Sequence, residues 1–521
     1  MSAEQTGHAL TEPLQLEHVL GVAADRFGDR CALIGDARKV TYTELEALAL
    51  GCAAQLRARG VQPGDAVVVL VANSVSYVAA LFGALMTGAV VATLSPDSTA
   101  RELEAMVTTI GPRAAVVARG GEGRDVASEL DHVLPSARIE VQDADEPGWP
   151  TSTDRSLVVK RDPDSPAFVA FTSGSTGQPK GAVHRAVTLM HTGRFYLDLV
   201  ARCAAMTTVA TFPLYHLGGL TLVLLPTLLG GGTVVMMDGF TVPEFVEAVE
   251  RHRADHVAAI PAMLELLFLR ANVAEHDLSS LRWVMLSGAP VTNQLARQVH
   301  ERLGVTVFVG YGQTECPGTN VMTRKDTSVE DVGPMVGWPV EGYEVAILDH
   351  DGRPCPDGEI GEVCVRSHYQ MLGYLGNPEA TQTAIDQDGW LHMGDLGVLR
   401  PDGALEIRGR KKEMYIRGGF NVYPVEVEAA LLEHPDVSIA AVHPISDEVL
   451  GERGVAWVVP EAGRSIDPDD LRAFVGKTLA YYKLPDVVRV VAELPMNAVG
   501  KVDKRALRSR MAEGDDAADG P

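Results

Sequence analysis

The segment 172–181 has the residue types that bind phosphate groups. It reads Thr-Ser-Gly-Ser-Thr-Gly-Gln-Pro-Lys-Gly and directly follows an apolar run at 167–171. Glycines let backbone N–H groups approach phosphate oxygens, hydroxyl groups add donors, and Lys180 adds positive charge. The segment is not a Walker A loop, because Lys180 is followed by Gly181 rather than by Ser or Thr. We expect a phosphate-binding loop after a buried strand, with an ordinary surface turn as the alternative.

Six further segments follow this loop in an order that makes a family resemblance specific. They are 212–216 (Phe-Pro-Leu-Tyr-His), 287–290 (Ser-Gly-Ala-Pro), 310–315 (Gly-Tyr-Gly-Gln-Thr-Glu), 390–395 (Trp-Leu-His-Met-Gly-Asp), 407–414 (Ile-Arg-Gly-Arg-Lys-Lys-Glu-Met) and 495–504 (Pro-Met-Asn-Ala-Val-Gly-Lys-Val-Asp-Lys). Together they resemble the motifs of the adenylate-forming superfamily, which includes acyl- and aryl-CoA synthetases, nonribosomal peptide adenylation domains and beetle luciferases. The resemblance covers roughly residues 15–510. One such motif could arise by chance, whereas six in order are a strong signal.

The resemblance implies a nucleotide site built from these motifs. In it, Tyr311 stacks on adenine, Asp395 accepts hydrogen bonds from the ribose hydroxyls, and Thr314 contacts the α-phosphate. Glu315 holds Mg2+, which prefers hard carboxylate ligands. The residues implied to bind ATP or AMP are Thr172, Ser173, Gly174, Ser175, Thr176, Gly177, Lys180, Gly288, Ala289, Pro290, Gly310, Tyr311, Gly312, Gln313, Thr314, Asp395, Ile407 and Arg410.

The resemblance also implies residues that join a carboxylate to ATP. A carboxylate is already ionised at neutral pH, so the reaction needs no general base, and the main barrier is charge repulsion from the polyphosphate. Lys501 would bridge the carboxylate and the α-phosphate, where that repulsion is greatest. The implied catalytic residues are Lys501, Thr314, Glu315 and His216, and the implied acyl pocket contains His216, Gly218, Gly219, Gly312 and Pro317.

The resemblance also implies a small C-terminal domain that rotates between two half-reactions, which are adenylation of the acid and transfer of the acyl group to a thiol. The polar link 409–412 precedes a unit of about a hundred residues, which is large enough for a small domain. Lys412 is the expected pivot in this link. Gly418 and Gly419 are expected to help form the tunnel for the thiol of CoA, whereas Lys501 on the same unit serves adenylation.

Each of these residues also has an ordinary interpretation. Tyr311 could be a core aromatic residue, Asp395 a turn residue, and Lys501 a solvated surface lysine. His216 could simply begin a helix, and the pair at 418–419 could form a simple turn. The surrounding motifs favour the functional interpretation.

The identity of the acid is less constrained. The stretches that match the pocket walls contain glycines, which suggests an open pocket, and they are 192–196 (Thr-Gly-Arg-Phe-Tyr), 217–220 (Leu-Gly-Gly-Leu) and 316–319 (Cys-Pro-Gly-Thr). Arg194 is the only basic residue among them, so a dicarboxylic acid is disfavoured if Arg194 faces away from the pocket. Fatty, aryl and polycyclic acids all stay open.

Composition excludes several other classes of protein. The chain has 521 residues, which is too many for one core, and a net charge of -24, which disfavours nucleic acid or an anionic membrane as the main partner. Its six scattered cysteines form no C-x-x-C pair and have no histidine cluster beside them, which favours a reducing compartment without structural zinc. The polar start at 1–14 does not resemble a signal peptide, and the most apolar stretch, 220–229, is about half a membrane span. We expect a cytoplasmic protein.

The elements that must position the motifs indicate an α/β fold. Apolar runs alternate with helix-like stretches, which favours parallel sheets covered on both faces. The expected strands are 66–71, 89–93, 114–118, 166–171, 256–260, 283–286 and 305–309, with a helix at 76–86. After about residue 335, alternating runs at 361–366 and 403–408 and four Asp-Gly pairs predict a hairpin-rich β region. Beyond the link, helices are expected at 424–432 and 468–479, and strands at 437–442 and 455–459.

We therefore expect three parts: a large N-terminal domain of parallel or mixed sheets with a β-rich subdomain (1–408), a hinge (409–412) and a small mobile α+β domain (413–521). The favoured function is ATP-dependent activation of a small-molecule carboxylic acid as acyl-AMP, with release of pyrophosphate and transfer to CoA. ATP, Mg2+ and CoA are the expected cofactors and substrates of a monomer or homodimer.

Two other functions stay open at this point. One is a stand-alone adenylating enzyme that loads an acyl carrier protein. The other is a non-catalytic nucleotide-binding scaffold, which the presence of Lys501, Glu315 and Asp395 disfavours. A luciferase-like oxygenase is disfavoured because no residue indicates oxygen chemistry.

Overall fold

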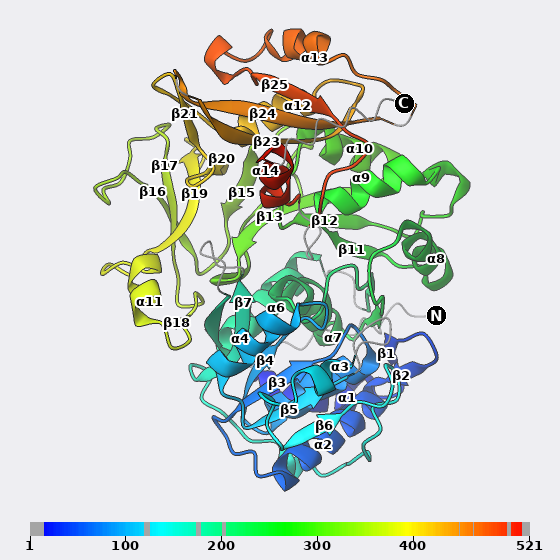
Figure 1. Ribbon diagram of the computed structural model, residues 1–521. Helices are drawn as coiled ribbons and strands as arrows, with labels where there is room; N and C mark the ends of the chain where they lie inside the picture. Colours follow the sequence, from blue (N-terminus) through cyan, green and yellow to red (C-terminus); the bar gives the residue numbers. More distant parts are fainter. Residues whose placement is uncertain are drawn as a thin grey trace.

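The computed structural model describes residues 15–118, 125–172, 179–200, 205–447, 449–461, 463–496 and 502–512. Strands within these residues form three sheets, of seven, thirteen and five strands. This arrangement confirms the expected α/β fold with more than one sheet. Figure 1 shows the seven-stranded sheet at the lower end of the molecule and the five-stranded sheet at the upper end.

The seven-stranded sheet carries the two ends of the phosphate loop. Its parallel strands are β3 (Ala66–Leu70), β4 (Val90–Thr93), β5 (Ala114–Val117), β6 (Arg138–Glu140) and β7 (Pro166–Thr172). Strand β8 (Lys180–Arg185) runs antiparallel to β7, and β18 (Gly373–Tyr374) runs antiparallel to β8. Thr172 and Lys180 are opposite each other in the ladder of β7 and β8, so the loop begins and ends at one place on the sheet.

Helix α3 (Val75–Met86) lies inside the main core. Ser74 caps it by accepting a hydrogen bond from the amide of Tyr77, and every residue of the helix is buried. A helix that is apolar on all sides needs neighbours all round, and α2 (Tyr42–Ala58) is one of them. The other α-helices of the described residues are α1 (Val19–Phe27), α4 (Ala100–Ile110), α5 (Val126–Glu129), α6 (Ala186–Val200), α7 (Leu225–Leu229), α8 (Val242–His252), α9 (Pro261–Arg270), α10 (Asn293–Leu303), α11 (Pro378–Ala384), α12 (Pro424–Leu432), α13 (Pro468–Val475) and α14 (Lys504–Ala512).

The thirteen-stranded sheet joins a parallel half to an antiparallel half. The parallel half contains β1 (Cys31–Ile34), β9 (Thr207–Val209), β10 (Thr233–Val235), β11 (His256–Ala259), β12 (Trp283–Ser287) and β13 (Thr306–Gln313). The antiparallel strands are β2 (Lys39–Thr41) at one edge and β14 (Cys316–Met322), β15 (Met335–Pro339), β16 (Glu344–Leu348), β17 (Gly361–Arg366), β19 (Leu391–Leu399) and β20 (Leu405–Arg410) toward the other. The glycines of the four Asp-Gly pairs have φ angles of 76° to 81°, as their turns require, and they are Gly352, Gly358, Gly389 and Gly403. The prediction of a hairpin-rich region is confirmed.

The five-stranded sheet is built only from the last part of the chain. Its strands are β21 (Tyr415–Arg417), β22 (Phe420–Val422), β23 (Val437–Asp447), β24 (Gly451–Pro460) and β25 (Val487–Val490). Two hydrophobic clusters pack against this sheet, and all of their buried members come from residue 415 onward. In Figure 1 this sheet and its helices form the orange and red part of the molecule.

Five predicted elements differ from the structure by two to five residues at one end or both. The strands predicted at 305–309, 437–442 and 455–459 are longer in the structure, where they form β13, β23 and β24. The strand predicted at 403–408 begins at Leu405 and continues to Arg410. It continues because β19 offers further partners, so that Gly409 pairs with Leu396 within the ladder rather than lying in a free link. The helix predicted at 468–479 ends at Val475, just before Gly476, because glycine is a poor helix former.

The apolar stretch 220–229 is part of the core. It forms a π-helical turn, Gly219–Leu224, that continues into α7, and all of these residues are buried. In the part of the chain that the structure describes, none of the helices combines the length and the apolar character that crossing a membrane demands.

Candidate nucleotide and acyl site

Two of the predicted nucleotide motifs meet at one edge of the thirteen-stranded sheet. Strands β12 and β13 are parallel, with Ser287 opposite Gly310. The carboxyl ends of neighbouring parallel strands meet at the same edge, so the segment 288–290 leaves the sheet beside Tyr311. Gly288 has a φ of 85°, which lets the chain turn directly after β12.

Asp395 is the centre of a contact set that comes from three strands. Its Oδ2 accepts a hydrogen bond of 2.6 Å from the hydroxyl of Tyr311 on β13, and its Oδ1 lies 2.7 Å from Nε of Arg410 on β20. Asp395 itself is on β19 and is only 4% exposed, and a buried carboxylate needs such partners. Burial and the charge of Asp395 raise the pKa of Tyr311 well above its usual value. The phenol therefore stays protonated and donates the hydrogen bond to Asp395. The structure thus brings together the residues predicted to hold adenine and ribose.

Two further residues of the predicted set lie on the same strands as Tyr311 and Arg410. The side-chain amide of Gln313 lies 3.0 Å from the sulfur of Met393 on β19, and Ile407 precedes Arg410 on β20. Thr314 occupies the turn that joins β13 to β14.

Glu315 is held by a tyrosine that the sequence analysis missed. The hydroxyl of Tyr374 donates a 2.6 Å hydrogen bond to Oε1 of Glu315, and Nζ of Lys180 lies 5.2 Å from the centre of the Tyr374 ring. Burial and Glu315 raise the pKa of this tyrosine, so it stays a donor. Tyr374 therefore connects the predicted metal ligand to the end of the phosphate loop. It lies in a strand of two residues far along the chain, and no motif or spacing points to it.

The glycines near Glu315 allow close packing rather than open space. A Cβ on Gly312 would lie 2.2 Å from the carbonyl oxygen of Gly318, and a Cβ on Gly310 would lie 2.2 Å from Cε of Met285. A Cβ on Gly318 would lie 1.9 Å from a methyl carbon of Thr192. These glycines let β13, β14 and α6 approach one another closely.

The interpretation of the wall glycines as room for substrate is therefore wrong for most of them. A Cβ on Gly193 would lie 2.9 Å from Leu225, and one on Gly219 would lie 2.2 Å from the backbone oxygen of Pro213. Only at Gly218 is there no described atom within 4 Å of the added carbon, so Gly218 alone of the four wall glycines adjoins open space.

Aromatic side chains lie beside the wall stretch that begins at Thr192. The imidazole of His191 stacks on Tyr369 with ring centres 3.6 Å apart, and the ring of Tyr343 lies 5.9 Å from that of His191. The hydroxyl of Thr192 donates to the backbone oxygen of Pro317 at 3.3 Å, which joins two of the predicted wall stretches. His216 directly precedes the helical segment that contains Gly218 and Gly219, and the amide of Leu220 donates to its backbone oxygen.

Several predicted residues lie outside the described part of the chain. They are Ser173, Gly174, Ser175, Thr176 and Gly177 in the phosphate loop, and Gly500 and Lys501 near the C-terminus. The residues next to them are described: Thr172 pairs with Lys180, and Met496 forms an antiparallel bridge with Val502.

The predicted pivot and the predicted tunnel residues lie in two short turns. Lys412 is in the turn between β20 and β21, where the amides of Glu413 and Met414 both donate to the carbonyl of Arg410. Gly418 and Gly419 join β21 to β22 with φ angles of 57° and 84°, which disfavour any residue with a side chain. The amide of Gly418 donates to the backbone oxygen of Leu450 at 2.8 Å, so this turn rests on the β23–β24 hairpin.

Comparison with known proteins identifies relatives over nearly the whole chain. The family model for AMP-binding enzymes matches residues 20–375, and the model for the AMP-binding enzyme C-terminal domain matches residues 426–501. A feruloyl-CoA synthase from an Amycolatopsis species is 35% identical over 476 residues, covering 90% of this chain and 94% of the relative. A 3-[(3aS,4S,7aS)-7a-methyl-1,5-dioxo-octahydro-1H-inden-4-yl]propanoyl:CoA ligase from Rhodococcus jostii is 34% identical over 525 residues, covering 95% and 99%.

Solved structures give the same result. The amide bond synthetase McbA from Marinactinospora thermotolerans superimposes with a TM-score of 0.85 at 31% identity, covering 95% of this chain and 99% of McbA.

Proposed function

The chain belongs to the AMP-binding enzyme family and is an ATP-dependent acyl-CoA ligase, and from this premise we propose the role of each site residue and the class of acid. The acid, ATP and CoA become acyl-CoA, AMP and pyrophosphate through an acyl-AMP intermediate. The observation that carries the assignment is the buried Asp395 with its two partners, Tyr311 and Arg410, at the edge where the nucleotide motifs meet.

Asp395 binds the two ribose hydroxyls, and Tyr311 offers its ring to adenine. The contacts of Asp395 with Tyr311 and Arg410 orient the carboxylate before the nucleotide arrives, so binding requires little reorganisation. Arg410 adds a donor at the ribose. The segment 288–290 lines the adenine from the neighbouring strand.

The phosphates of ATP lie over the loop between β7 and β8, with Lys180 at its end. Glu315 fits the Mg2+ that accompanies ATP in this family, because a carboxylate is a hard oxygen ligand. One of its oxygens is held by Tyr374, and the ring of Tyr374 lies beside Lys180. When bound, Mg2+ supplies positive charge that neutralises the phosphate oxygens. Thr314 donates to the α-phosphate from the turn next to Glu315.

Lys501 makes the contact that matters most for adenylation. Its ammonium group bridges the substrate carboxylate and the α-phosphate and lowers their mutual repulsion. His216 lies at the mouth of the acyl pocket, next to the open space beside Gly218.

The last part of the chain, 413–521, acts as a mobile domain that pivots at Lys412. Its separate sheet and separate hydrophobic clusters support this division. After adenylation it turns so that the Gly418–Gly419 turn replaces Lys501 at the reaction centre and lines the path of the CoA thiol.

The acid carries a ring system. Two relatives that cover nearly the whole chain are named for ring-bearing acids, one aromatic and one bicyclic. The stacked rings of His191 and Tyr369 lie beside the wall stretch that begins at Thr192, and such a rigid, flat pair suits a rigid ring better than a flexible chain.

CoA is the acceptor in preference to a carrier protein, since the named CoA ligases match the chain over nearly its full length. We also propose a cytoplasmic location, where ATP and CoA are available, and a monomer or homodimer as the functional form.

The test measures pyrophosphate release and product formation with a panel of acids, each with and without CoA. Ferulate and a bicyclic propanoic acid should release pyrophosphate and form acyl-CoA, and a straight-chain fatty acid of equal carbon number and a dicarboxylic acid should react at least tenfold more slowly. Activity only with a carrier protein, or only with an amine as in an amide bond synthetase, would replace CoA as the acceptor. Preference for the straight-chain acid would overturn the assignment of acid class.

A further inference from the structure

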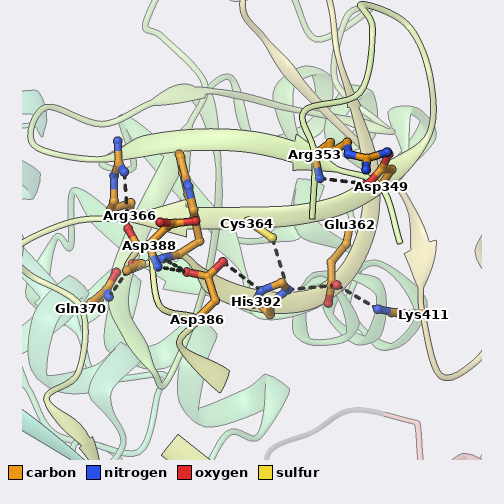
Figure 2. Close-up of polar contacts among 12 residues, drawn as sticks. Asp349, Arg353, Glu362, Cys364, Arg366, Gln370, Asp386, Asp388, His392 and Lys411 are labelled. Atoms are coloured by element: carbon orange, nitrogen blue, oxygen red, sulfur yellow. Dashed lines mark hydrogen bonds and ion pairs between the residues drawn. The ribbon is translucent and has the colours of Figure 1, made fainter. Parts of the chain in front are cut away.

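Three side chains with different donor atoms converge on one side of the β-rich region. Glu362 and Cys364 are two residues apart on β17, and His392 is opposite Cys364 on the neighbouring strand β19. Alternate residues of a strand point to the same face, so all three side chains lie together, as Figure 2 shows. A carboxylate oxygen, a sulfur and an imidazole nitrogen from these residues lie within 4.8 Å of one another.

The distances between these atoms match those around a tetrahedral zinc ion. Zinc bonds of about 2.0–2.1 Å to nitrogen or oxygen and about 2.3 Å to sulfur imply edges of roughly 3.3–3.6 Å between ligand atoms. Nδ1 of His392 lies 3.5 Å from Sγ of Cys364 and 3.1 Å from Oε2 of Glu362. Two of the three edges therefore need almost no adjustment of the side chains.

Asp386 is placed to orient the imidazole. Its Oδ2 lies 3.5 Å from Nε2 of His392, on the side of the ring away from Glu362 and Cys364. A histidine that binds metal through Nδ1 carries its proton on Nε2 and usually donates it to a carboxylate or a carbonyl. The cluster thus has the outer carboxylate that zinc-binding histidines commonly use.

The ammonium group of Lys411 pairs with Glu362 in this cluster, where a bound metal ion would otherwise supply the positive charge. Its Nζ lies 2.9 Å from the same Oε2 of Glu362 that contacts His392. The Lys411 side chain is 56% exposed whereas that of Glu362 is 11% exposed, so an ion arriving from solvent can displace the ammonium group and take its place. Lys411 is also in the turn that leads into the last domain, next to Lys412.

We propose that Glu362, Cys364 and His392 form a zinc site, with Asp386 as the partner of the histidine and Lys411 as the competitor of the ion. A set of one sulfur, one nitrogen and one oxygen ligand suits zinc and is a poor set for Mg2+, which separates this site from Glu315. Sequence spacing gave no sign of it, since Cys364 and His392 become neighbours only through the pairing of β17 and β19.

Binding has a definite proton balance. Zinc bonds to the sulfur as the S–H bond breaks, and one proton leaves to the solvent.

The experiment uses the full chain, stripped of metal by a chelator, and titrates it with Zn2+ by calorimetry and with Co2+ by absorption spectroscopy. We expect one ion per chain and a thiolate-to-cobalt charge-transfer band. Millimolar Mg2+ should not displace the Zn2+ or the Co2+. Cys364→Ser should abolish the band and weaken Zn2+ binding at least about 100-fold. Asp386→Asn should keep the band but weaken binding about 10- to 100-fold, as is usual for a lost outer partner.

Two further variants make the result specific. Lys411→Met should tighten Zn2+ binding several-fold, because the competing ammonium group is gone, and a merely structural cluster would not respond in this direction. Cys355→Ser, which changes another cysteine of the same region, should bind like the wild type. No stoichiometric Zn2+ binding, or a charge-transfer band that survives Cys364→Ser, would overturn the proposal. Neither readout uses the ligase reaction, so the outcome is independent of the proposed function.

Discussion

At the scale of single residues, Asp395 has two kinds of role that can be separated. Its carboxylate accepts from Tyr311 and pairs with Arg410, and it is proposed to accept from the ribose hydroxyls as well. The internal contacts affect stability, whereas the ribose contacts affect only nucleotide binding. Asp395→Asn keeps the shape of the side chain and one acceptor oxygen. Asp395→Ala removes both carboxylate oxygens and with them both kinds of contact.

We expect Asp395→Ala to raise the KM for ATP by about 10- to 100-fold. Hydrogen bonds to a charged group contribute about 1.5–3 kcal/mol, and 1.4 kcal/mol corresponds to a factor of ten. Asp395→Asn should have a smaller effect, and Asp351→Ala, in an exposed Asp-Gly turn, should have none. Steady-state kinetics at saturating acid and CoA give the values, and an unchanged KM for ATP in Asp395→Ala would refute the ribose assignment.

Lys501 is expected to act in only one half-reaction. Lys501→Ala should slow adenylate formation by roughly 10²–10³-fold, the usual effect of losing one key charge-stabilising donor. Transfer from pre-made acyl-AMP to CoA should stay within about twofold of the wild type, because the α-phosphate repulsion is then already overcome. Pyrophosphate exchange measures the first step and thioester formation the second. Equal losses in both would point to misfolding, so Lys477→Ala serves as a control for a lysine elsewhere on the same domain.

At the scale of the elements, a buried histidine connects three of them. His256 on β11 is fully buried, and its ring nitrogens contact the hydroxyls of Tyr196 on α6 and Thr208 on β9. Burial lowers the pKa of His256 to about 3, so the ring is neutral in the folded protein. In the unfolded chain the same ring takes up a proton near pH 6.5.

The sign of the pH effect follows from these two values. Between pH 6.5 and 3 the unfolded state binds one more proton at this site, so stability should fall as the pH falls, by up to about 1.4 kcal/mol per pH unit. Urea unfolding between pH 7.5 and 5.5 measures the slope. His256→Gln should lower stability at pH 7.5 yet reduce the slope, whereas His350→Gln, at a histidine that is 90% exposed, should leave the slope unchanged. The same slope in His256→Gln and the wild type would contradict this account.

The ends of a strand were predictable where the local sequence determines them, and not where the length of a neighbouring strand determines them. The valine-rich run of β3 is buried on both faces and could form little else, and its bounds were predicted within one residue. The extension of β20 through Gly409 and Arg410 depends on the length of β19, which lies earlier in the chain and is visible only in the ladder. A prediction from local pattern ends such a strand where its alternation ends.

The site was predictable where residues are consecutive in a motif. Tyr311 and Asp395 come from two motifs, and the structure brings them within hydrogen-bonding distance. Tyr374, in contrast, reaches Glu315 through the pairing of β18 with β8. The prediction of an open pocket from the wall glycines failed for a related reason. A missing Cβ can leave room for a ligand or let another part of the chain approach. Only the packing shows that the backbone of Pro213 fills the space at Gly219 and the side chain of Thr192 fills it at Gly318.

At the scale of the whole molecule, the last domain is proposed to take two positions, one for each half-reaction. Proline fixes φ near -65°, removes an amide donor and restricts the residue before it. Lys412→Pro should therefore lock the turn between β20 and β21. We expect it to keep pyrophosphate exchange within about threefold of the wild type and to slow transfer from isolated acyl-AMP to CoA by at least about tenfold.

Lys412→Ala is the matched control, since it removes the same side chain without restricting the backbone, and it should support both steps. If Lys412→Pro forms acyl-CoA at the normal overall rate, the pivot lies elsewhere or no large rotation is needed. If it loses adenylation but keeps transfer, the pivot stands and the locked position is the other one.

The continuity of β20 has a consequence for anyone who recombines this enzyme with a relative. The strand carries Arg410, the partner of Asp395, and the chain leaves it only at Lys411. A chimera joined at residue 408 would bring a foreign residue 410 and a foreign end of the ladder next to Asp395. A chimera joined within the turn at 411–413 would exchange the last domain and keep the contacts of Asp395 with Tyr311 and Arg410. A shift of the junction by three to five residues would thus decide whether the contacts of Asp395 in a hybrid come from one parent or from both.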